Sequence, residues 1–61
     1  MMKTIFVFLA DGFEEIEAIT PIDVLRRAGL NVQTVSVMEG QTVAGAHGIP
    51  VVADKMFADI H

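Results

Sequence analysis

The chain of 61 residues contains no cysteine, only two histidines and only four basic residues. Small domains usually rely on disulfides or a structural metal, and this composition offers no disulfide and few metal ligands. The net charge of −4 argues against nucleic acid or an anionic membrane as a partner. The apolar run at residues 5–10 is too short to span a bilayer, and Lys3 alone is a poor start for a signal peptide. We therefore expect a cytoplasmic protein.

Apolar residues, by contrast, are abundant. They make up 52% of the chain, and the mean hydropathy is +0.54. A chain of this size buries only about 60% of its unfolded surface when it folds. The sequence therefore predicts more apolar surface than its own fold can cover, so that a second segment or a partner subunit must cover the rest.

The order of elements predicts an α/β fold. Residues 3–10 form a continuous apolar run, which is typical of a strand buried on both faces of a parallel sheet. Asp11 and Glu14 match a capping box, so a helix is expected over residues 14–28. Gly29 suits the position that ends such a helix.

The second half of the chain contains shorter elements. Residues 31–37 have good β propensity, and residues 42–44 and 49–53 are predicted to pair as a hairpin. Residues 54–61 carry apolar residues at helical spacing and predict a helical turn. A strand, a helix and a second strand form a βαβ unit, which is not a complete domain. We interpret the chain as the first third of an α/β domain.

Glu17 is the most unusual residue of the predicted helix. Its neighbours at helical spacing are mostly apolar: Phe13, Thr20, Pro21, Val24 and Ala28. A carboxyl group that is buried without a cation holds its proton to higher pH and can then donate a hydrogen bond. Two interpretations remain open. Either backbone amides or an arginine from the rest of the protein bond the Glu17 carboxylate, or Glu17 has a functional role.

Pro21 lies inside the predicted helix and removes the hydrogen bond to the carbonyl group of residue 17. Either it marks a simple kink or restart of the helix, or it holds the backbone near Glu17 open for a site. Asp23 has Arg26 and Arg27 at ion-pair spacing. Glu15 lies on the same face of the predicted helix as Ile19, Ile22 and Arg26.

The predicted helix has no clean polar face. Its interleaved charged and apolar residues are typical of a helix that is covered on two sides, by a sheet and by another helix or subunit. A two-fold contact between helices would place Ile16 near its middle.

Two motifs carry a resemblance to a known family. The run FLADGFEEIEAITPIDVLRRAGLNV, followed by GAHGIPVVAD, resembles the amino-terminal third of the ThiJ/PfpI family, in the branch of the parkinsonism-associated deglycase. The resemblance covers essentially the whole chain. It implies a flavodoxin-like, class I glutamine amidotransferase-like three-layer sandwich, usually dimeric.

The resemblance also implies roles for individual residues. The family uses a cysteine on a strained strand-to-helix turn, beside a protonated glutamate of the first helix that matches Glu17. The first helix forms much of the dimer contact, which would include Ile16, Asp23 and Arg27. A basic residue at the hairpin tip matches His47 at the periphery of the site, and Gly12 lies at the first strand-to-helix turn beside it.

The absence of cysteine departs from this pattern. The family nucleophile lies beyond residue 61, so this chain alone cannot perform the thiol chemistry, and we expect it to be part of a longer polypeptide. The resemblance implies a glyoxalase- or deglycase-type hydro-lyase or hydrolase that acts on small reactive carbonyls. The alternatives are a redox-sensing stress protein or chaperone, and a role in thiazole monophosphate biosynthesis.

No cofactor or metal is expected. His47 and His61 are a poor metal pair. The glycines spell neither a phosphate loop nor a dinucleotide fingerprint, and the acids around Gly12 would repel an anion. A remaining alternative is an acidic, metal-binding receiver-like domain that uses Asp11 with Glu14 or Glu15.

Overall fold

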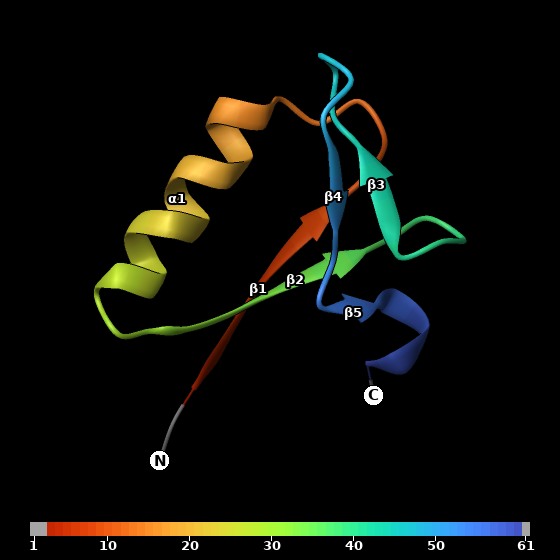
Figure 1. Ribbon diagram of the computed structural model, residues 1–61. Coiled ribbons are helices and arrows are strands. Elements are labelled where there is room, and N and C mark those ends of the chain that lie inside the picture. Colours follow the sequence, from red (N-terminus) through yellow and green to blue (C-terminus); the bar gives the residue numbers. More distant parts are fainter. Residues whose placement is uncertain (1–2, 61) are drawn as a thin grey trace.

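A parallel sheet, a helix on one of its faces and a β-hairpin make up residues 3–60, the part of the chain that the computed structural model describes (Figure 1). The elements, in chain order, are β1 (Thr4–Leu9), α1 (Glu15–Arg27), β2 (Asn31–Ser36), β3 (Thr42–Ala44), β4 (Pro50–Val52), β5 (Lys55–Met56) and the 3₁₀ turn η1 (Phe57–Asp59). The sheet has the order β1-β2-β5, and β3 pairs with β4. The predicted α/β class is confirmed.

Strand β2 is the centre of the sheet. It runs parallel to β1, with Thr4 opposite Asn31 and Leu9 opposite Ser36. Its last residues also pair in parallel with β5. The βαβ unit expected from the sequence is therefore present, and the carboxyl ends of β1 and β2 lie at the same edge of the sheet.

Strand β1 is covered on one face only within the described residues. Leu9 is 1% exposed, whereas Phe6 and Phe8, which point to the opposite face, are 37% and 53% exposed. The ring of Phe8 packs edge-on against that of Phe57, with centroids 6.0 Å apart. The prediction of a strand buried on both faces is thus not met by residues 3–60, because they supply no layer beyond the aromatic side.

The start of α1 differs from the prediction. Glu14 is the residue that precedes the first helical turn, and its side chain makes no capping hydrogen bond. Asp11 does not cap the helix either, because its Oδ1 accepts a hydrogen bond from the backbone N–H of Ala44 at 3.1 Å. The predicted capping box is therefore wrong, because Asp11 bonds a backbone N–H of the hairpin, which is distant in the sequence and plays no part in the capping motif.

The end of α1 agrees with the prediction. Gly29 has a φ of +86°, the left-handed conformation that glycine adopts without strain. Its N–H bonds the carbonyl of Arg26, and the N–H of Leu30 bonds the carbonyl of Leu25. These two bonds form a Schellman motif, which satisfies carbonyls that the helix end would leave unpaired. Pro21 lies within the helix, which continues to Arg27.

The last predicted element is found only in part. Lys55 and Met56 form the short strand β5, and the helical turn is confined to η1, a 3₁₀ turn at Phe57–Asp59. Lys55 and Met56 pair with Val35 and Ser36 of β2. This pairing satisfies backbone groups at the open edge of the sheet and overrides the helical spacing of the apolar residues. His61, the last residue of that prediction, lies outside the described residues.

The core lies between α1, the sheet and the base of the hairpin. Its buried apolar members are Leu9, Ile22, Val32, Val35, Val43 and Ala53. Burying a side chain such as Leu9 contributes roughly 1.5–3 kcal/mol to folding. This small core fixes the hairpin against the edge of the sheet where β1 ends and α1 begins.

Candidate functional site

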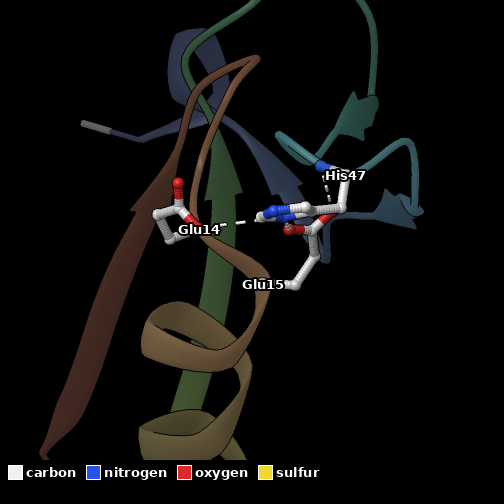
Figure 2. Close-up of side chains that lie close together, drawn as sticks. All are labelled: Glu14, Glu15 and His47. Carbon is white, nitrogen blue, oxygen red and sulfur yellow. Dashed lines mark hydrogen bonds and ion pairs between the residues drawn. The ribbon is translucent and has the colours of Figure 1, made fainter.

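Glu15 anchors the place where α1 meets the hairpin tip (Figure 2). It is the first residue of α1 and is only 8% exposed. Its Oε2 accepts hydrogen bonds from the backbone N–H groups of His47, at 2.8 Å, and Ile49, at 3.4 Å. Its Oε1 lies 2.8 Å from Nδ1 of the His47 ring. One carboxylate therefore ties three groups of the hairpin tip to the helix.

The backbone brings these segments together. The N–H of Gly12 bonds the carbonyl of Ala44, and the N–H of Ala46 bonds the carbonyl of Phe13, both at 2.8 Å. Gly12 has a φ of +91°, so the turn after β1 uses a conformation that glycine allows at low cost. At Gly45, an added Cβ would lie 2.8 Å from Cγ of Glu15 and closer still to its carboxylate. The hairpin can approach Glu15 only because residue 45 has no side chain.

These contacts shift the pKa values of Glu15 and His47 in opposite directions. The hydrogen bond from His47 lowers the pKa of Glu15 to about 2, and the backbone N–H groups of His47 and Ile49 act in the same direction, while burial opposes them. The hydrogen bond to Glu15 and the negative charges of Glu15 and Glu14 raise the pKa of His47. Glu15 is thus held as an anion, and His47 is the group whose charge responds to pH.

Glu14 completes the cluster. Its Oε2 lies 3.8 Å from Nδ1 of His47, and its side chain is 56% exposed. A hollow of 270 Å³ opens beside the three side chains, and Ile16 and Ile49 supply its apolar wall. The arrangement can bind a cation between two carboxylates and an imidazole, or hold a small molecule against the two isoleucines.

Glu17 is exposed in the structure, and so are Thr20, Pro21 and Val24 of its stripe. The carboxylate therefore points away from the sheet that α1 covers. Neither a buried Glu17 nor a partner for it is found within residues 3–60, and its catalytic role stays a prediction. Gly12 and His47, predicted at the periphery of the same site, do lie together, since the turn of Gly12 bonds the hairpin that carries His47.

The residues predicted at a dimer contact are also on the outer surface of α1. Ile16 is 81% exposed, a large fraction for an isoleucine. Nε of Arg27 donates to Oδ1 of Asp23 at 2.8 Å, which confirms that ion pair. No partner chain tests the contact itself, so the dimer stays a prediction.

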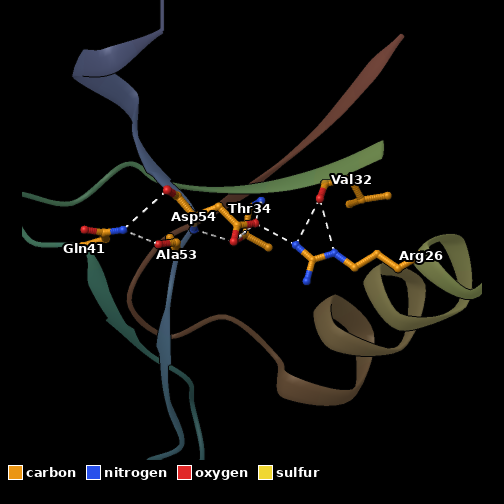
Figure 3. A network of polar contacts seen from close by, with 6 residues as sticks. All are labelled: Arg26, Val32, Thr34, Gln41, Ala53 and Asp54. Atoms are coloured by element: carbon orange, nitrogen blue, oxygen red, sulfur yellow. Dashed lines mark hydrogen bonds and ion pairs between the residues drawn. The ribbon is translucent and has the colours of Figure 1, made fainter. Parts of the chain in front are cut away.

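Arg26 does not pair with Asp23 as predicted. Its guanidinium donates to the carbonyl of Val32, with Nη2 at 3.0 Å, and to Oδ2 of Asp54 at 2.7 Å (Figure 3). The same Oδ2 accepts the backbone N–H of Thr34 at 2.8 Å, and this bond is the largest cause of a lowered pKa of Asp54. Arg26 thus crosslinks α1, β2 and the segment before β5. The predicted ion pair of Arg26 with Asp23 is therefore not formed, because Val32 and Asp54 supply the acceptors for the guanidinium.

Glu15 is the residue that the sequence reasoning missed. Arg26 lies on the same predicted helix face as Glu15, but Arg26 bonds Asp54, and the hairpin supplies the donors to Glu15. A signal was present, because Glu15 lies one and two helical turns before Ile19 and Ile22, and Ile22 is buried against the sheet at 5% exposure. The stripe that faces the core therefore begins with Glu15.

Comparison with known proteins identifies the family. Residues 3–61 match the model of the DJ-1/PfpI family. The chain belongs to this family. The match includes the turn of Gly12, the anchor at Glu15 and the hairpin with His47, so the resemblance inferred from the sequence motifs is confirmed.

Individual relatives agree. The chain is 43% identical over 58 residues to Protein DJ-1 homolog A of Arabidopsis thaliana, and the matched segment makes up 95% of this chain and 15% of that protein. It is 37% identical over 60 residues to Protein dj-1beta of Drosophila melanogaster, where the matched segment makes up 98% of this chain and 32% of the fly protein. The chain thus spans less than two fifths of the length of these relatives, in their amino-terminal portion.

Solved structures show the same fold. A DJ-1 superfamily protein of Salmonella typhimurium matches with a TM-score of 0.91 and 45% identity over 95% of this chain and 31% of that chain. Oxidized DJ-1 of Toxoplasma gondii matches with a TM-score of 0.88 and 42% identity over 90% and 30% of the two chains. The β1-β2-β5 sheet with α1 is therefore the amino-terminal part of the DJ-1 fold.

Family membership overturns the alternative of a metal-binding receiver-like domain, and Asp11, one of its proposed ligands, is bonded to the backbone of Ala44. Within residues 3–60, no helix is long and apolar enough to cross a membrane.

Proposed function

We propose that the protein that carries this segment acts on small reactive carbonyls in a glyoxalase- or deglycase-like reaction. The observation that carries the proposal is the family match over residues 3–61, which includes the motif around Glu17. The nucleophile would be a cysteine outside this chain, which has none. In support, the similar Salmonella structure is of a variant in which a cysteine is replaced by alanine.

Glu17 would move the proton in this reaction. A thiolate adds to the aldehyde carbon and leaves an alkoxide, which needs a proton at once. A carboxyl group within hydrogen-bond reach can supply that proton and later take one back. Glu17 is suited to this role by its place on the exposed side of the first turns of α1, where it is available to residues beyond this chain.

Turnover of methylglyoxal to lactate by the protein at its natural length tests the proposal. We expect the wild type to form lactate and Glu17→Gln to lose about 10²–10⁴-fold in kcat, the usual contribution of a positioned acid–base group. Glu39→Gln is the matched control, since Glu39 is an exposed acid in the loop after β2. Absence of lactate from the wild type would refute the enzymatic proposal, and equal turnover by Glu17→Gln would refute the role of Glu17.

Redox sensing is the second candidate, because the similar Toxoplasma protein was solved in an oxidized form. A protein of this kind would convert its cysteine to a sulfinic or sulfonic acid with peroxide and would leave methylglyoxal unchanged. Intact mass measured before and after peroxide, together with the lactate assay, separates the two candidates. No observation favours a role in thiazole monophosphate biosynthesis.

We also propose that the protein forms a homodimer through α1, in the cytoplasm. Ile16, at 81% exposure, would lie near the centre of the contact, with Asp23 and Arg27 at its rim. Ile16→Glu should shift sedimentation from dimer to monomer, because it would bury an unpaired charge. Ile16→Val should leave the dimer intact. Dimerisation of Ile16→Glu with unchanged affinity would place the interface elsewhere.

A further inference from the structure

One cluster of metal-ligating side chains has no part in the proposed carbonyl chemistry. Glu14, Glu15 and His47 each offer one ligand atom, and these atoms all lie within 4.8 Å of one another. Glu14 and Glu15 stand at the start of α1, and His47 stands at the hairpin tip, so the donors converge from two segments (Figure 2). The set combines two carboxylates with an imidazole, which is a richer donor set than a group of acids alone.

The spacing of the donors suits a zinc-sized ion. Zinc binds imidazole nitrogen and carboxylate oxygen at about 2.0–2.2 Å, so two ligand atoms of a tetrahedral site lie about 3.4 Å apart. Nδ1 of His47 lies 2.8 Å from Oε1 of Glu15 and 3.8 Å from Oε2 of Glu14. One of these distances is shorter than the required value and the other is longer.

The cluster combines one fixed ligand with two adjustable ones. Oε2 of Glu15 is held by two backbone N–H groups, which leaves Oε1 directed at His47. Such hydrogen bonds to a ligating carboxylate are the usual way in which a protein orients a metal ligand. The side chains of His47 and Glu14 are 71% and 56% exposed and can close on an ion from the solvent side.

Within residues 3–60, a hollow leaves one side of the cluster uncovered. Its volume is 270 Å³, and Ile16 and Ile49 line it together with the three ligands. Three protein ligands and an open side leave room for a water molecule in the fourth position, as in zinc sites that are not closed.

We propose that Glu14, Glu15 and His47 bind a divalent cation of the zinc class, with the hollow between α1 and the hairpin tip as its open side. The imidazole favours zinc over magnesium or calcium, which prefer sites made of oxygen alone. The bound ion would replace the hydrogen that Nδ1 of His47 and Oε1 of Glu15 share, and would join the hairpin to α1 more firmly. Neither Glu17 nor a cysteine is among the ligands of this site.

Binding of Co²⁺ and Zn²⁺ to the protein at its natural length tests this site. Co²⁺ reports its own ligands, since thiolate ligation adds a charge-transfer band that nitrogen and oxygen ligands do not produce. We expect one Co²⁺ per chain without that band, displaced by Zn²⁺ and not by a large excess of Mg²⁺. His47→Asn should weaken binding at least tenfold, and Glu14→Gln should weaken it measurably.

Two controls make the outcome decisive. Glu39→Gln removes an exposed acid outside the cluster and should bind as the wild type does. The amide spectrum of His47→Asn should retain the dispersion of the wild type, which shows that the protein still folds. Equal Zn²⁺ affinity of His47→Asn and wild type, or binding that always carries the thiolate band, would overturn the proposal, as would the absence of any Zn²⁺ binding.

Discussion

Replacing Gly45 by alanine tests how the hairpin is held against α1. An added Cβ would lie 2.8 Å from Cγ of Glu15, and its contacts with the carboxylate are closer still. Real Cβ atoms do not approach other heavy atoms so closely, so either Glu15 or the hairpin must move. Glu15 cannot move without lengthening its bonds to the N–H groups of His47 and Ile49.

The expected cost follows from this geometry. Inserting a methyl group into a packed site usually costs about 1–3 kcal/mol, and the loss of backbone contacts places this case in the upper part of that range, at about 2–3 kcal/mol. That corresponds to roughly a 30- to 150-fold change in the unfolding equilibrium. Urea denaturation of the protein at its natural length, followed by circular dichroism, measures it.

Gly40→Ala is the matched control, since nothing lies within 4 Å of a Cβ added there. We expect it to change the free energy of unfolding by less than about 0.5 kcal/mol. A double-mutant cycle with Glu15→Ala adds a second test, because removing the carboxylate removes the collision. Gly45→Ala should then cost less, with a coupling of at least about 0.5 kcal/mol. Equal stabilities of the two alanine variants, or a cycle without coupling, would refute the reasoning.

Three further changes test other parts of the structure. Leu9→Ala should lower the free energy of unfolding by about 2–5 kcal/mol in urea denaturation, because Leu9 is 1% exposed and its loss leaves a cavity. Asp54→Asn should make the free energy of unfolding depend less on pH in acid. Because the pKa of Asp54 is lowered, the ionised carboxylate stabilises the fold above the ordinary pKa of 3.8, and this stabilisation is lost as the pH falls below that value. The difference from wild type should therefore shrink in acid. Arg27→Ala should cost only about 0.3–0.5 kcal/mol by thermal denaturation, since its ion pair with Asp23 is exposed.

The sequence was sufficient for elements whose signals are local. The apolar run of β1, the stop at Gly29 and the hairpin around residues 45–48 each depend on residues close in the chain, and each is found in the structure. The family motif was equally local, and the DJ-1/PfpI match confirms it. Local patterns of this kind survive folding because the tertiary contacts reinforce them.

The failures share the opposite cause. The residues concerned all bond to groups far away in the chain: Asp11 to the N–H of Ala44, Arg26 to the carboxylate of Asp54, and residues 55–56 to strand β2. In each case a local pairing that looked adequate was replaced by a distant backbone donor, acceptor or strand edge. Periodicity places a side chain on a face, but it does not say which distant partner lies opposite.

Glu15 and Glu17 show how that limit bears on function. At about 100° per residue, side chains two positions apart on a helix point roughly 160° apart, so one acid faces the hairpin and the other faces away. Because Glu15 is fixed by His47 and Ile49, the rotation of the first turn of α1 is fixed as well. The direction in which Glu17 points is therefore set by contacts that Glu17 does not make. If Glu17 moves a proton in the reaction, the fit between Gly45 and Glu15 is part of what positions it.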